Sequence, residues 1–177
     1  LYKKLAILSL LLLVIAGCSG DESTTGPSVA DLSSGWSLYE SGDNVGATTV
    51  FTAVIASDIQ NAEAHNALGW AATQIGNTEQ GKLEFLKAIE CGMTTAAPYA
   101  GLAFALMDIA PADFHGAISS ALTALEISPE WVFAHRTSLD WRDIRLVLAI
   151  SYFAIHDFDS ANQQVEIKSI DATLADD

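Results

Sequence analysis

The sequence has few basic residues. Only 8 lysines and arginines stand against 22 aspartates and glutamates, which gives a formal net charge of −14 at pH 7. Nucleic acid and anionic lipid surfaces repel so acidic a chain, so we expect no nucleic-acid partner. The acidity has two interpretations: it keeps the protein soluble, or it attracts a partner that carries a basic patch.

Cysteines and long apolar runs are also scarce. Residues 5–16 are predominantly apolar, but this stretch is too short for a transmembrane helix, which needs about 20 residues. The only cysteines are Cys18 and Cys91. Because Cys91 lies in an apolar helical pattern, we expect a buried thiol rather than one that pairs with another molecule.

The motifs of common enzymes are missing. His65, His115, His135 and His156 are scattered, and none has a metal-binding spacing to a carboxylate or a thiol. The chain has no phosphate-binding loop, no Gly-x-Ser-x-Gly motif and no Cys/His arrangement typical of catalysis. We therefore expect no catalytic site, no metal site and no cofactor apart from covalent lipid.

The first eighteen residues have the pattern of an export signal. Lys3 and Lys4 precede the apolar stretch, and small residues precede Cys18. The ending Ile-Ala-Gly-Cys resembles the lipobox of bacterial lipoproteins. This resemblance implies removal of residues 1–17, a diacylglycerol on the sulfur of Cys18 and an acyl chain on its amine. Two or more chains hold a protein stably at a membrane. The alternative is an ordinary secretory signal with an incidental cysteine.

Residues 18–30 are rich in Gly, Ser, Thr and Asp and read as a flexible, lipidated tether. Ser19, rather than aspartate, follows the cysteine, and by resemblance to enterobacterial lipoproteins this indicates the outer membrane. The remaining chain has 160 residues and a charge of about −16, enough for one domain with a hydrophobic core. We expect a lipid-anchored protein of the cell envelope that faces the periplasm.

Residues 31–177 contain a repeat with a period of 34 residues. The matched pairs are Gly35 and Gly69, Trp36 and Trp70, Gly42 and Gly76, Phe51 and Phe85, and Ile55 and Ile89. Self-similarity at this period is typical of helix–turn–helix arrays. The clearest unit, at 62–89, resembles the tetratricopeptide repeat (TPR). The resemblance implies an all-α, right-handed superhelix of about eight helices, in which His156 takes the turn position of Gly76.

An insertion at about 130–143 separates the third and fourth units. Tryptophan and arginine are the side chains that anchor interfaces, so one interpretation is a binding surface. The candidate residues of this insertion surface are Trp131, Arg136, Trp141 and Arg142. The other interpretation is a lengthened helix or a packed loop, with tryptophans that fill gaps and arginines that pair with nearby aspartates.

In TPR arrays, the first helix of each pair lines a concave groove. By resemblance, the predicted partner-binding residues are Trp36, Tyr39, Asn66, Trp70, Gln74, Phe104 and Met107. Trp36, Trp70, Phe104 and Ile150 occupy equivalent positions and form an apolar stripe, which marks a peptide or helix site if it is exposed. The insertion or the curvature of the array could instead cover this stripe.

The leading functional hypothesis is a non-catalytic, lipid-anchored scaffold that binds a peptide or helix of an envelope protein. By analogy with outer-membrane lipoproteins that carry such repeats, its setting is the assembly of envelope complexes. One alternative is a self-association module that forms a homo-oligomer. Another is an anion-binding or enzymatic protein, which requires Arg136, Arg142 and Arg145 to converge on an open pocket.

Overall fold

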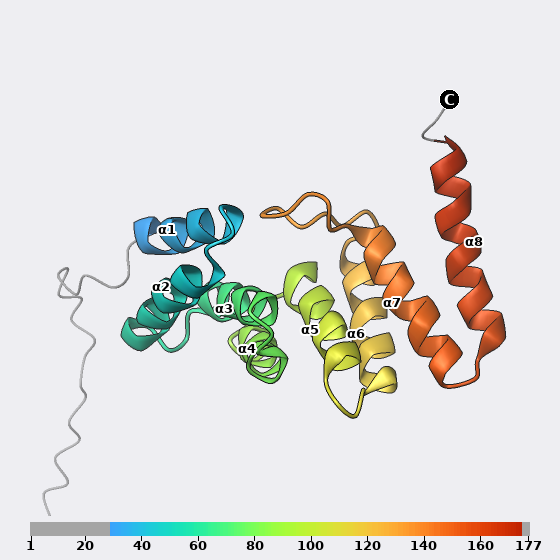
Figure 1. The fold of residues 1–177 in the computed structure, drawn as a ribbon, viewed down its shortest axis with the longest axis horizontal. Helices are drawn as coiled ribbons and strands as arrows, with labels where there is room; N and C mark the ends of the chain where they lie inside the picture. The colour runs from blue at the N-terminus through green and yellow to red at the C-terminus, as the bar shows by residue number, and fades with distance from the viewer. Residues whose placement is uncertain (1–28, 175–177) are drawn as a thin grey trace, which may run out of the picture.

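The computed structural model describes residues 29–174, which form eight α-helices. The helices are α1 (Val29–Glu40), α2 (Asn44–Ser57), α3 (Ala62–Gln74), α4 (Thr78–Glu90), α5 (Ala96–Asp108), α6 (Phe114–Ile127), α7 (Trp141–Ala154) and α8 (Phe158–Leu174). Each helix packs on the next, and neighbouring odd-numbered helices also contact one another, so they form one layer of the array (Figure 1). The all-α array of helix pairs predicted from the repeat is confirmed.

The predicted signal segment at 1–17, the predicted lipidation site Cys18 and nearly all of the predicted tether lie outside the described residues. Helix α1 begins at Val29, so the array starts slightly before the predicted boundary at residue 31. Among the described helices, none is both long enough and apolar enough to cross a membrane.

Tight turns between paired helices depend on residues with a positive φ. Gly42 has a φ of +89° and Gly76 one of +80° at equivalent places in the first two units. Glycine adopts this conformation without strain because it has no Cβ. His156 takes the same place in the fourth unit with a φ of +65°, as the repeat alignment predicted.

Glycines in the first helix of a pair leave room for a phenylalanine ring of the second helix. A Cβ atom added to Gly69 would lie 2.6 Å from Cε1 of Phe85, and one added to Gly101 would also collide with the Phe85 ring. Phe85 is fully buried between α3 and α5. The same contact recurs 34 residues earlier between Gly35 and Phe51, which explains why the repeat retains both residue types.

A buried polar pair joins α3 to α4. Nδ1 of His65 lies 2.6 Å from Oε2 of Glu84, and Nε2 of His65 lies 3.0 Å from the carbonyl oxygen of Ile59. Both His65 nitrogens therefore have structural partners. In the part of the chain that the structure describes, no group of three or more His, Cys, Asp or Glu residues could hold a metal ion.

The expectation of a buried Cys91 is wrong, because this residue is only half-buried. It ends α4, at the edge of the helix pair, and its Sγ lies 3.7 Å from Oε1 of Gln60. The apolar helical pattern around it predicted the helix but not the exposure of the residue that follows its last turn.

The glycine–phenylalanine contact predicts the effect of Gly69→Ala. Overpacking costs about 1–3 kcal/mol, whereas alanine gains only about 1 kcal/mol of helix propensity over glycine. We expect Gly69→Ala to lower the free energy of unfolding, measured by urea denaturation. In a Phe85→Leu background the same change should cost much less, since the smaller side chain leaves room for the methyl group. An additive double mutant would contradict this packing.

Candidate partner-binding groove

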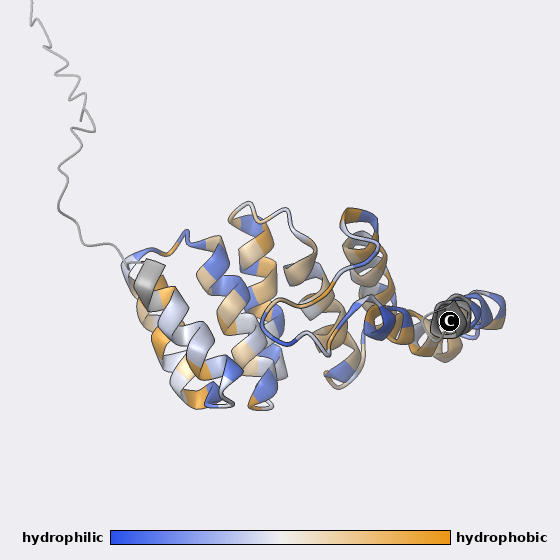
Figure 2. Ribbon diagram, turned by 90° about the horizontal axis from the view of Figure 1, so that it is seen from above, coloured by the Kyte–Doolittle hydropathy of each residue, from blue (hydrophilic) through white to orange (hydrophobic). Residues whose placement is uncertain are grey.

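The insertion is a loop, not a lengthened helix. It spans 128–140 between α6 and α7, and Trp141 and Arg142 already belong to the first turn of α7. The loop folds back on itself: the amide of Phe133 donates to the carbonyl oxygen of Leu139 over 2.9 Å, and that of Trp141 donates to Trp131 over 2.7 Å. Figure 1 shows the orange loop crossing above α5 toward α1. Figure 2 shows it from above, with hydrophobic and hydrophilic residues mixed along it.

Alternate side chains of the loop enter the concave face. Phe133 stacks on Trp70 with ring centroids 4.3 Å apart, and Trp131 stacks on the same ring at 6.2 Å. His135 stacks on Trp36 at 3.6 Å with an angle of 4° between the planes. Phe133 is only 3% exposed, whereas Val132 between these residues is 49% exposed. The loop therefore lies in the groove as a short extended stretch at 131–133 followed by a turn, with one face buried.

As a consequence, part of the predicted stripe is covered. Trp36, Tyr39, Asn66 and Trp70 are all buried, and the aromatic ones pack against the loop. The open groove therefore does not exist over the first two units, because Trp131, Phe133 and His135 fill it. These three inward-facing residues alternate along the chain, but the alternation is too short to be a sequence signal for a strand.

The tip of the loop contacts α1 through a hydrogen-bonded side-chain pair. Nδ1 of His135 lies 2.8 Å from Oε1 of Glu40, and Glu63 of α3 lies beside the same two residues. Burial raises the pKa of Glu63 above its ordinary value, because desolvation disfavours the charged carboxylate. The nearby His135 and hydrogen bonds from Trp36 and Asn66 offset part of this rise.

The three arginines do not converge. Arg142 pairs with Asp140 over 3.0 Å and lies over the ring of Trp141. Arg145 donates to Gln164 over 2.9 Å, on the side of α7 that faces α8. Only Arg136 reaches the groove, where its Nη1 donates to Oε1 of Gln74 over 3.0 Å. The three arginines therefore do not form the shared anion site that the alternative hypothesis requires. The predicted insertion surface is also divided, because Arg136 faces the groove and Arg142 does not.

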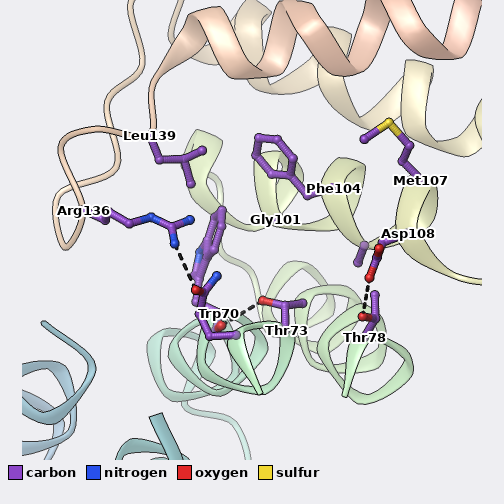
Figure 3. A pocket seen from close by; sticks show the side chains of 11 residues that line it. Trp70, Thr73, Thr78, Gly101, Phe104, Met107, Asp108, Arg136 and Leu139 are labelled. Atoms are coloured by element: carbon purple, nitrogen blue, oxygen red, sulfur yellow. Dashed lines mark hydrogen bonds between the residues drawn. The ribbon is translucent and has the colours of Figure 1, made fainter. Parts of the chain in front are cut away.

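A hollow remains open between α3, α5, the start of α4 and the loop. Its volume is about 280 Å³. The lining residues are Trp70, Thr73, Gln74, Thr78, Gly101, Phe104, Ala105, Met107, Asp108, Arg136 and Leu139. Figure 3 shows Arg136 at one end, Phe104 and Leu139 above Trp70, and Asp108 with Met107 at the other end. Four predicted groove residues thus meet two residues of the insertion, Arg136 and Leu139, so the groove and the insertion form a single surface.

The hollow has polar groups at both ends and an apolar middle. Asp108 accepts a hydrogen bond from the hydroxyl of Thr78 over 2.7 Å. Nε1 of Trp70 is buried and has no hydrogen-bond partner among the described residues. Mostly apolar walls with a few directed polar groups are typical of binding sites in proteins.

Beyond the loop, the first helix of the fourth unit is exposed. Ile150 and Phe153 of α7 are 43% and 64% exposed, although the repeat places them on the groove side. Leu146, one turn earlier, is also exposed. The loop thus covers the groove at the start of the array and leaves its end uncovered.

Comparison with solved structures identifies the fold. The chain superimposes on the crystal structure of MamA with a TM-score of 0.63 and 21% identity, over 76% of this chain and 71% of that one. A thermophilic TPR protein from Thermus thermophilus, TTC0263, gives a TM-score of 0.61 and 16% identity, over 78% and 71%. The fold is TPR-like.

Part of a mutant O-GlcNAc transferase from Thermobaculum terrenum has a similar fold. It matches with a TM-score of 0.57 and 22% identity, over 70% of this chain and 21% of that one. No protein-family model and no curated protein matches the sequence. At these identities the likeness concerns the fold, and the function of this TPR-like chain has to be argued from its own surfaces.

The docked loop predicts that Phe133→Ala destabilises the array. Removing a buried phenylalanine side chain costs about 3–5 kcal/mol, and here it also uncovers Trp70. We expect a loss of this size in urea denaturation, together with a red shift of tryptophan fluorescence. Val132→Ala is the control, because Val132 belongs to the same loop but faces solvent. If Phe133→Ala were no more damaging than Val132→Ala, the loop would not occupy the groove in solution.

Proposed function

We propose that this protein is a lipid-anchored, periplasm-facing scaffold that binds a segment of an envelope protein. The TPR-like fold supports protein–protein interaction in general, and such repeats are typically non-catalytic. The observation that carries the proposal is the hollow where Arg136 of the loop meets Trp70, Phe104 and Met107. Because the loop fills the first part of the groove, the partner contacts this hollow and the concave surface that follows it.

The start of the chain supports the same proposal. The Ile-Ala-Gly-Cys ending at Cys18 resembles a lipobox, and a stretch rich in Gly, Ser, Thr and Asp follows it. Lipid on Cys18 would confine the array to a membrane surface, where its partners are other envelope proteins.

A second candidate function, self-association, has its own observation. Leu146, Ile150 and Phe153 lie along α7 at helical spacing, and all three are exposed. Isolated exposed apolar residues are normal, but a row on one helix face fits a contact between copies of the chain.

The anchor can be tested by metabolic labelling. Cells that express the full chain with labelled palmitate should yield a labelled protein in the membrane fraction. Cys18→Ala should lose the label and leave that fraction, because cleavage and acylation both require the cysteine. Cys91→Ala is the matched control and should behave as wild type. A chain that keeps its label without Cys18 would contradict lipidation at this residue.

The binding surface can be tested by crosslinking in detergent-solubilised envelopes. We expect an envelope protein to be recovered with the wild-type chain and lost with Met107→Ser, whose side chain lines the hollow. Leu86→Ser is the control, since Leu86 is also apolar and exposed but lies on α4, outside the hollow. If both variants retained the same partner, the hollow would not be the contact.

Recovery of a second copy of the chain as the crosslinked species would favour self-association instead. In that case Phe153→Ser should lower the molecular mass in solution, whereas Met107→Ser should not.

A further inference from the structure

We infer that the hollow recognises a short extended segment with three features: a carboxylate, a large apolar side chain and a cationic side chain, in a row on one face. This inference rests on the proposed scaffold function and specifies the chemistry of the partner. It follows from the order of groups along the hollow, which runs from Arg136 through Trp70 and Phe104 to Asp108 (Figure 3).

Arg136 supplies the site for the carboxylate. In the described part of the chain no carboxylate oxygen lies within 4.0 Å of it, unlike Arg142, which pairs with Asp140. Its one hydrogen bond goes to the neutral Gln74. A guanidinium has five N–H donors in a planar fork that fits a carboxylate in bidentate fashion. Most of these donors remain available at the end of the hollow.

Asp108 supplies the site for the cation. It is exposed at the end of α5, and the hydroxyl of Thr78 orients one of its oxygens. No lysine, arginine or histidine among residues with described side chains forms an ion pair with it. The two ends of the hollow therefore carry opposite charges that this chain leaves without ionic partners.

The middle of the hollow fits one large apolar side chain. Trp70, Phe104, Met107 and Leu139 form its apolar wall, and the whole hollow, with a volume of about 280 Å³, is just below the range of most drug-sized pockets. A hollow of this size takes side chains of one short segment rather than a folded element.

The loop itself shows which backbone conformation this groove accepts. Trp131 and Phe133 enter it from the extended stretch around Val132, and His135 follows from the turn that begins at Phe133. Side chains on one face of an extended chain are about 6.6–6.8 Å apart, because each residue adds about 3.3–3.4 Å. A segment with the order acid, any residue, apolar, any residue, base would therefore place its three groups along the hollow.

The test uses the blocked peptide acetyl-Glu-Ala-Leu-Ala-Lys-amide, titrated into the full chain in detergent by calorimetry. The peptide has no net charge, so the acidity of the protein contributes little, and it is too short for a stable helix. We expect binding that weakens about five-fold with Arg136→Gln or Asp108→Asn, the size of a partly exposed ion pair. Replacing leucine by serine in the peptide should weaken it at least as much.

Lys87→Gln and Glu90→Gln are matched controls. They make the same charge changes at exposed positions near the end of α4, away from the hollow, and should bind the peptide as wild type does. Equal weakening by these variants would show a general charge effect and would overturn the inference.

Charge reversal keeps the test informative if Arg136→Gln disturbs the loop. Arg136→Glu should bind acetyl-Lys-Ala-Leu-Ala-Lys-amide more tightly than the wild-type chain does. The inference would be overturned if no peptide bound, or if the affinities were the same in the wild-type chain and in the Arg136 and Asp108 variants. Neither result would affect the scaffold function, since crosslinking with Met107→Ser tests that separately.

Discussion

The stacking of Phe133 on Trp70 determines what the concave face of this molecule can do. It brings a loop between the third and fourth units onto helices of the first two, and Trp131 and His135 follow it into the groove. Aromatic rings bury large areas and gain from their stacked geometry. The face that binds ligands in many helical repeats is thereby partly occupied by the chain's own residues, and the remaining opening acquires Arg136 as a new wall.

The three arginines contribute to this arrangement in two different ways. The chain is strongly acidic, yet its three arginines lie within ten residues of one another, at the loop and the start of α7. Two of them stabilise the junction: Arg142 pairs with Asp140, the residue that caps α7, and Arg145 bonds Gln164 of α8. The third, Arg136, reaches the hollow. Residues of one type, close in sequence, thus divide between structural support and a binding surface.

The repeated elements were predictable because their signals are local. The spacing between Trp36 and Trp70 indicated the period, and the turn residues Gly76 and His156 have the positive φ that their alignment implied. The path of the loop was not predictable in the same way. The residues that the loop contacts are distant in sequence, as Gln74 is from Arg136, and a local sequence pattern does not indicate such contacts. The sequence indicated an insertion and a concave face, but it left open whether one covers the other.

The path of the loop also changes how the stability of the array is distributed among its repeats. In an ordinary solenoid each repeat contacts only its neighbours, so stability is nearly a sum of local terms and unfolding can begin at either end. Here His135 touches Trp36, a residue of the first unit, although its own loop follows the third. This contact closes the linear chain of repeats into a ring of interactions. Loss of the first helix pair would release the loop, and the array would come apart cooperatively rather than fraying unit by unit.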